Sequence, residues 1–329
     1  MVDDPRRPSG VIADGGDADD GEDAGAERRG FTVAAPQHGE RLDKVLVGHV
    51  PEFSRSHLQH LIKAGWVELD GARQSSPAQR VRAGQSLSVV LQPTAESRAY
   101  RPEPLPLAVL HQDDDVLVID KAPGMVVHPA AGNWSGTLLN ALLARDPASA
   151  ALPRAGIVHR LDKDTSGLMV VGRTLAAVTA LTRAIAAREV QRRYLAIAHG
   201  APPETRWSIE APIGRDPRVR TRMAIVSSGK PARTDVERIA VGAGFAALRC
   251  TLHSGRTHQI RVHLAAQGLP LVGDRLYGGV PALGMERQAL HAALLAFRHP
   301  RSGERLAFES GPPGDFAHAW KEVLAGAAS

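Results

Sequence analysis

The sequence of 329 residues contains one cysteine, so no disulfide bond can form within the chain. This residue, Cys250, falls in the apolar segment 245–252, which predicts a buried structural thiol in a reducing, cytoplasmic environment. Aromatic residues make up 4% of the chain, and no apolar segment approaches the roughly 20 residues of a membrane-spanning helix. Arg6 and Arg7 precede no apolar segment either, so we expect neither a secretory signal nor contact with a membrane.

Positive charge is scarce at the start of the chain and concentrated after it. Residues 1–30 hold nine acidic residues and four arginines, whereas the remainder holds 36 basic and 26 acidic residues, a net charge of +10. This separation of charge indicates a polyanionic partner such as RNA. Residues 1–35 also contain few large apolar side chains, which predicts a disordered acidic tail.

Residues 36–92 have the pattern of a small α/β domain. Apolar residues at helical spacing, with Ser54 as the N-cap of the second run, predict two short helices, and alternating apolar residues near 67 and 87 predict strands. Several segments of this region resemble the small RNA-binding domain first described in a ribosomal small-subunit protein. The resemblance implies that four basic residues contact RNA: Arg41, Lys44, Arg55 and Lys63. Asp43 is expected at the surface, in the first turn of a helix.

A segment rich in proline, residues 93–106, predicts a semi-rigid linker to a larger domain over residues 107–329. Leucine-rich periodic segments predict helices near 138–143 and 175–185, and Thr257 is expected to cap a third helix that ends at Gly268. Short apolar runs between them predict strands without a regular alternation of strand and helix. We therefore expect an α+β fold, in which helices flank a mixed, mainly antiparallel β-sheet.

The segment 159–168 of the larger domain reads His-Arg-Leu-Asp-Lys-Asp-Thr-Ser-Gly-Leu. Apolar runs at 155–158 and 168–171 flank it, which predicts a polar loop held between two strands. Such a loop is a typical place for catalytic groups, because the sheet fixes the side chains while leaving them open to substrate. Asp162 is the candidate catalytic residue.

This segment resembles the signature of the RluA/RluD-type RNA pseudouridine synthases, in which the equivalent of Asp162 is the catalytic aspartate. Residues 190–196 resemble the second motif of that family, which implies that Tyr194 stacks on the target base. Residues 254–264 resemble the third motif, which implies that Arg261 pairs with the aspartate. The resemblance further implies that Leu290 is the apolar wall of the base pocket. We add the hypothesis that Arg160 fills the space left by the base or binds flanking phosphates.

The implied reaction converts uridine to pseudouridine, and it needs neither a metal ion nor a cofactor. The carboxylates at 113–115 lack further spaced oxygen ligands, and His253, His258 and His263 have a spacing of five that does not place two of them on one helical face. We therefore expect no metal site. Whether the aspartate forms a covalent adduct or abstracts a proton is left open.

Large-subunit ribosomal RNA is the expected substrate and transfer RNA the alternative, with the enzyme a cytoplasmic monomer. Two other classes of protein are considered. A hydrolase would pair Asp162 with Asp164, but residues two apart in an extended loop tend to point away from a shared site. A non-catalytic RNA-binding ribosome-assembly factor would have no use for the combination of Asp162, Tyr194 and Arg261.

Overall fold

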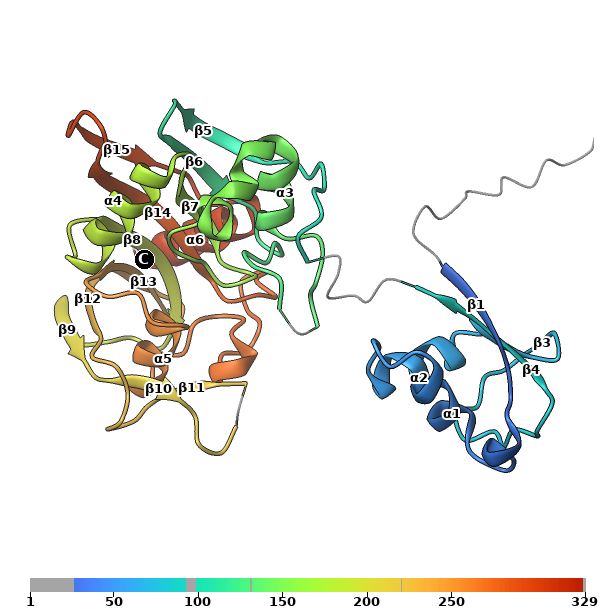
Figure 1. Ribbon diagram of the computed structural model, residues 1–329. Coiled ribbons are helices and arrows are strands. Elements are labelled where there is room, and N and C mark those ends of the chain that lie inside the picture. Colours follow the sequence, from blue (N-terminus) through green and yellow to red (C-terminus); the bar gives the residue numbers. More distant parts are fainter. Residues whose placement is uncertain (1–26, 93–98, 131, 220, 328–329) are drawn as a thin grey trace, which may run out of the picture. The chain divides into compact units, whose positions relative to one another are not determined.

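The computed structural model describes residues 27–92, 99–130, 132–219 and 221–327 (Figure 1). The chain divides into two compact units, one within residues 1–94 and the other within residues 95–329. Residues 1–26 of the expected tail and residues 93–98 of the expected linker lie outside the described residues. Among the described residues, no helix combines the length and the apolar character needed to cross a membrane.

The first unit is a four-stranded antiparallel sheet with two helices packed against it. The strands follow the order β1-β4-β2-β3, and their bounds are β1 (Glu27–Thr32), β2 (Val67–Leu69), β3 (Ala72–Arg73) and β4 (Ser86–Leu91). The helices are α1 (Leu42–His49) and α2 (Arg55–Lys63), preceded by the short 3-10 helix η1 (Ala35–Gln37). The hydroxyl of Ser54 accepts a hydrogen bond from the backbone N–H of His57, so it caps α2 as expected.

The strand β1 corrects the expected extent of the tail. Residues 27–32 pair in register along the whole of β4, and Val33 is buried in the core of the first unit. Phe31 and Val33 alternate along this segment and pack into the core of the first unit. Two apolar residues next to a long acidic stretch are too few to predict a strand from the sequence. The folded unit therefore begins before residue 36.

The second unit is built on a nine-stranded sheet, which can be followed in Figure 1 from β5 to β9. Its strands run in the order β5-β6-β7-β14-β8-β13-β12-β9, with β15 also paired to β14. Within this sheet the strands pair antiparallel, except that β7 pairs with β14 in parallel. The bounds are β5 (Ala108–Gln112), β6 (Val116–Lys121), β7 (Ser166–Gly172), β8 (Gln191–His199), β9 (Arg206–Glu210), β12 (Arg233–Gly242), β13 (Phe245–Leu252), β14 (Leu290–Arg298) and β15 (Arg305–Glu309). A separate hairpin consists of β10 (Ile213–Arg215) and β11 (Met223–Ile225).

Helices cover both faces of this sheet, so the predicted α+β class with a mainly antiparallel sheet is confirmed. The helices α3 (Leu138–Arg145) and α5 (Gln259–Ala266) pack on one face, where Leu117, Tyr194 and Leu248 point. The helices α4 (Leu175–Ala186) and α6 (Gly314–Ala327) pack on the other face. Further 3-10 helices are η3 (Pro147–Ala151), η4 (Pro153–Gly156) and η5 (Arg275–Tyr277).

The helices α3 and α4 were expected from the spacing of their apolar residues. In the structure each of them also begins at a threonine N-cap. The hydroxyls of Thr137 and Thr174 accept hydrogen bonds from the backbone N–H groups of Asn140 and Ala177. Cys250 is buried in the core between these layers, as predicted, and burial raises the pKa of its thiol to about 12. The thiol is therefore protonated and unreactive at neutral pH.

Two expected segments differ in the structure. Residues 99–105 of the expected linker pack on α3, because Asn140 donates hydrogen bonds to the carbonyl oxygens of Ala99 and Arg101 at 3.2 and 2.8 Å. They therefore belong to the second unit. The expected strand 155–158 is wrong: its first two residues belong to η4, and Ile157 forms a single bridge with Val171. A Cβ on Gly156 would lie 2.0 Å from the carbonyl oxygen of Gly172, so this turn is pressed against the end of β7.

Candidate active site

A buried lysine holds the loop that carries Asp162 in place. Lys121, at the end of β6, is 1% exposed, and its ammonium donates hydrogen bonds to the carbonyl oxygens of Ala122, Met125 and Lys163 at 2.8, 3.0 and 2.9 Å. Burial lowers the pKa of Lys121 to about 8, while the negative charges of Asp164 and Asp162 oppose the shift. One side chain thus holds three backbone groups around the loop.

Two further side chains, both from the segment just before β14, hold the same loop. Arg287 donates from Nη1 to the carbonyl oxygen of Asp164 at 2.8 Å and forms a bidentate pair with Asp315 at the start of α6. The amide of Gln288 donates to the hydroxyl of Thr165 at 3.4 Å. The loop is therefore held on several sides, as a catalytic group requires.

Arg261, in α5, connects the candidate catalytic residue to a second carboxylate. Its Nη1 donates to Oδ2 of Asp162 at 3.0 Å, and its Nε and Nη2 donate to Asp274 at 2.7 and 2.8 Å. Burial lowers the pKa of Arg261, but the hydrogen bonds and charges of the two carboxylates outweigh it and leave the pKa raised. The side chain of Asp162 is 15% exposed, so part of its carboxylate remains open to a substrate.

His258 and Tyr277 lie beside this ion pair. The hydroxyl of Tyr277 accepts from the backbone N–H of Met223 at 2.9 Å and lies 2.8 Å from Nδ1 of His258. Nε2 of His258, on the other side of the ring, lies 3.8 Å from Oδ1 of Asp162. Burial lowers the pKa of His258, although the charge of Asp162 opposes this, so the ring is neutral at neutral pH. The guanidinium of Arg261 lies 5.0 Å from the centroid of the Tyr277 ring.

Tyr194 and Leu290 come from neighbouring strands and face the same cleft as Asp162. Tyr194 lies in β8, Leu290 begins β14, and the two strands pair in antiparallel register. Both residues are buried, and burial raises the pKa of the Tyr194 phenol. The cleft has a volume of about 810 Å³, a size suited to a nucleotide-sized group. The structure thus brings together all five predicted site residues of this domain: Arg160, Asp162, Tyr194, Arg261 and Leu290.

The cleft is strongly positive. Among the described residues that line it, Asp162 is the one carboxylate, whereas six are arginines: Arg154, Arg160, Arg188, Arg192, Arg256 and Arg261. Asp164 does not line the cleft, so the residues described there offer no pair of carboxylates for glycoside hydrolysis. A wall of arginines around one carboxylate suits a polyanionic substrate.

Sequence reasoning missed several residues of this site. The sequence analysis gave no role to Asp274 or Tyr277. Lys121, the last residue of the apolar strand β6, was given no role either. A local signal was present for two of them, since Lys121 is a charged residue at the end of a buried strand and Asp274 directly follows a glycine. Their partners, however, are distant in the sequence.

The predicted RNA-binding residues of the first unit have different surroundings from those expected. Asp43 is fully buried, so its expected place at the surface is wrong. Arg41 and Arg55 both donate to its carboxylate, and these hydrogen bonds, with one from Gln59, hold the pKa of Asp43 well below its usual range despite burial. Lys44 pairs with Glu40 at 2.6 Å, and Lys63 is exposed. Contact of these four basic residues with RNA stays a prediction.

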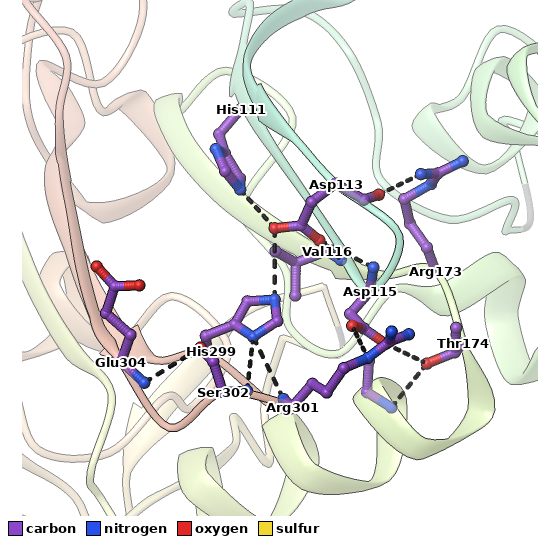
Figure 2. Close-up of polar contacts among 11 residues, drawn as sticks. His111, Asp113, Asp115, Val116, Arg173, Thr174, His299, Arg301, Ser302 and Glu304 are labelled. Carbon is purple, nitrogen blue, oxygen red and sulfur yellow. Dashed lines mark hydrogen bonds and ion pairs between the residues drawn. The ribbon is translucent and has the colours of Figure 1, made fainter.

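The acidic turn at 113–115 forms a hydrogen-bonded network (Figure 2). Asp113, Asp115 and His299 lie within 4.8 Å of one another, and Figure 2 shows His111 and His299 pointing toward Asp113. Nδ1 of His299 accepts from the backbone N–H groups of Arg301 and Ser302, so its proton is on Nε2, 3.3 Å from Asp113. A metal ion would need Nε2 without that proton. The arrangement therefore favours a structural role, in which these side chains join the turn between β5 and β6 to the turn between β14 and β15.

The three histidines considered as metal ligands point to separate partners. Nε2 of His253 lies 2.6 Å from Asp235, and Nδ1 of His263 lies 2.9 Å from the hydroxyl of Thr234. His258 contacts Tyr277, as described above. Across the described residues, these histidines do not gather into a metal-ligand cluster.

Known proteins resemble this chain over both units. The family described as RNA pseudouridylate synthase matches residues 115–266, and the S4 domain family matches residues 40–87. A Neisseria meningitidis protein named ribosomal large subunit pseudouridine synthase D is 46% identical over 304 residues, which cover 88% of this chain and 80% of that protein. A Xanthomonas campestris protein of the same name is 48% identical over 290 residues, which cover 84% and 87%.

A solved structure agrees with these sequence relatives. The human protein named RNA pseudouridylate synthase domain containing 1 has 30% sequence identity and a TM-score of 0.51, and the match covers 68% of this chain and 87% of that one. The matched segment 115–266 contains Asp162, Tyr194 and Arg261.

Proposed function

Because this chain belongs to the RNA pseudouridine synthase family, we propose that it isomerises specific uridines of large-subunit ribosomal RNA to pseudouridine, with Asp162 as the catalytic carboxylate. Two relatives that cover most of the chain carry the name of a large-subunit enzyme. The observation that carries the assignment of Asp162 is its ion pair with Arg261, at the bottom of a positive cleft.

The residues of the cleft suit the steps of this isomerisation. The bond between ribose and base must break, the base must turn, and a carbon–carbon bond must form. An ionised Asp162 supports attack on the electron-poor sugar carbon as well as removal of a ribose proton. The guanidinium of Arg261 aims the carboxylate, and the exposed part of Asp162 faces the cleft.

Two other side chains hold the base during its turn. The ring of Tyr194 provides a stacking surface for the detached uracil. Leu290 is an apolar wall that excludes water, which would otherwise hydrolyse the intermediate. The target base must leave its stack to enter this cleft, and Arg160 at the rim is exposed where the flanking phosphates would pass.

The first unit matches an RNA-binding family, so RNA is the partner of this chain. We propose that this unit binds structured ribosomal RNA through phosphates and helix shape, with Arg41, Lys44, Arg55 and Lys63 at the contact. We also propose that the enzyme works as a cytoplasmic monomer without a cofactor. Transfer RNA is the alternative substrate.

The test is carbodiimide-adduct primer extension on total RNA from cells with and without the gene. We expect stops in large-subunit ribosomal RNA that disappear in the deletion strain, return with the wild-type gene and stay absent with Asp162→Asn. Purified Asp162→Asn should lose more than about 10³-fold in rate and keep its affinity for RNA.

Other outcomes would identify the alternatives. If stops were lost from transfer RNA and not from ribosomal RNA in the deletion strain, transfer RNA would be the substrate. Unchanged stops in both, with intact RNA binding, would contradict the enzymatic assignment and favour an RNA-binding assembly factor.

A further inference from the structure

Arg192 is a buried cation without a partner in the cleft. It lies in β8 two residues before Tyr194, so both side chains point to the same side of the sheet. Its exposed fraction is 6%. The guanidinium contacts no hydrogen-bond acceptor or carboxylate of the described residues, and its Nε is buried without a partner.

The surroundings of Arg192 do not neutralise its charge. Asp162 is already paired with Arg261. His159, also in the cleft wall, accepts a hydrogen bond at Nε2 from the backbone N–H of Val170 at 3.0 Å. Burial, together with the positive charge of Arg192, lowers the pKa of His159 to about 3, so this ring is neutral. An uncompensated buried charge is strongly unfavourable, and the site is therefore completed by an anion.

The chemistry of the cleft identifies that anion as a phosphate. A guanidinium presents a planar fork of donors that matches phosphate oxygens. The Cα atoms of Arg192 and Tyr194 are roughly 7 Å apart along the strand, which is the scale of one nucleotide. A uracil stacked on Tyr194 would thus place a backbone phosphate of the same or the adjacent nucleotide near Arg192.

We propose that Arg192 binds a backbone phosphate beside the target uridine and so positions the flipped nucleotide between Asp162 and Tyr194. The inference rests on the proposed function. Gly255 supports it, because a Cβ at that position would lie 2.8 Å from Nη1 of Arg192. Glycine there leaves the room that the guanidinium needs to lie at the cleft.

The first experiment compares Arg192→Gln with Arg193→Gln, which removes the same charge from the opposite face of β8. The probe is an RNA of the region mapped by primer extension, assayed at several salt concentrations. We expect Arg192→Gln to weaken RNA binding or slow the single-turnover rate by roughly 10- to 100-fold. Its slope of log affinity against log salt should fall by about 0.7 to 0.9, the value for one phosphate. Arg192→Lys should recover part of the loss.

A second measurement tests the phosphate itself. Replacing single phosphates beside the target uridine with neutral methylphosphonates should slow the wild-type enzyme and Arg193→Gln at one position. Arg192→Gln should show no further loss at that position. If the methylphosphonate at every position slowed Arg192→Gln by the same factor as the wild type, the two effects would be independent. That result would contradict the assignment of a phosphate to Arg192.

Folding and activity controls separate the remaining cases. A lower melting temperature for Arg192→Gln with an unchanged salt slope would indicate a structural role and contradict the inference. A wild-type enzyme that makes pseudouridine, together with an Arg192→Gln variant that matches it in rate and affinity, would refute the inference alone. A wild-type enzyme that makes no pseudouridine in any RNA would refute the proposed function, and the inference with it.

Discussion

Arg261 and Asp274 form a bidentate ion pair in which Nε and Nη2 of the arginine lie 2.7 and 2.8 Å from the two carboxylate oxygens. The pair fixes the plane of the guanidinium and leaves Nη1 directed at Asp162. Asp274 is 2% exposed, so its oxygens are shielded from bulk solvent. We infer that Asp274 acts on the proposed reaction through Arg261, as a positioning group.

Substitution of Asp274 tests that relationship. Asp274→Asn keeps the shape of the side chain but replaces a charge-assisted acceptor, so Arg261 can turn away from Asp162. We expect the single-turnover rate to fall by roughly 10- to 100-fold, with RNA affinity unchanged. Asp146→Asn is the matched control, because Asp146 pairs with Arg173 away from the cleft. Equal losses in both variants would contradict a positioning role.

Gly167 connects the catalytic loop to β7, and its backbone permits no side chain. Its φ is +114°, and a Cβ would lie 2.3 Å from the carbonyl oxygen of Ala292 in β14. We expect Gly167→Ala to lower the free energy of unfolding by about 3 kcal/mol or more, from strain and overpacking together. Gly136→Ala, at φ +67° with open space around the Cβ, should cost only about 1 kcal/mol. Urea unfolding measures both, and similar losses would refute the close approach.

Lys121 makes stability depend on pH in the alkaline range. Its pKa is about 8 in the folded protein and near the ordinary 10.5 when unfolded. Between these values the unfolded chain binds a proton that the folded chain does not, so this group's contribution to stability rises with pH. We expect the wild type to gain up to about 3 kcal/mol relative to Lys121→Met between pH 8 and 10.5.

The control for this titration is Lys163→Met, which removes an exposed lysine from the catalytic loop. Urea unfolding at several pH values should show no comparable gain relative to that variant. A stability difference between wild type and Lys121→Met that stays constant or falls with pH would contradict the assignment.

The sequence located elements whose determinants are local. The helices α3 and α4 follow from leucine periodicity with a threonine cap, and α2 follows from Ser54. The helix α5 shows the limit of this reasoning. Thr257 was expected to cap it, but the helix begins after His258, whose φ of 56° turns the chain, and Thr257 does not serve as its cap. The side chain of this left-handed residue contacts the hydroxyl of Tyr277, which lies 19 residues away in the sequence.

The surroundings of a side chain were harder to predict than the helices. The tripeptide Arg-Leu-Asp shows why, because it occurs twice, at 41–43 and at 160–162. The residue types are the same, yet Asp43 is buried and paired with Arg41 and Arg55, whereas Asp162 is partly exposed to a cleft. Arg55 is 12 residues from Asp43, and Arg261 is 99 residues from Asp162. Family resemblance supplied the second pairing. No local pattern in the sequence supplied the first.

The parallel pairing of β7 with β14 has a consequence for the timing of folding. The hydroxyl of Ser166, beside the catalytic loop, lies 3.0 Å from Nδ1 of His291, across a separation of 125 residues. Contacts this distant in sequence form slowly, because a long loop must close first. During synthesis the loop of Asp162 leaves the ribosome well before β14, so we expect the enzyme to act on RNA only after that strand has emerged and docked.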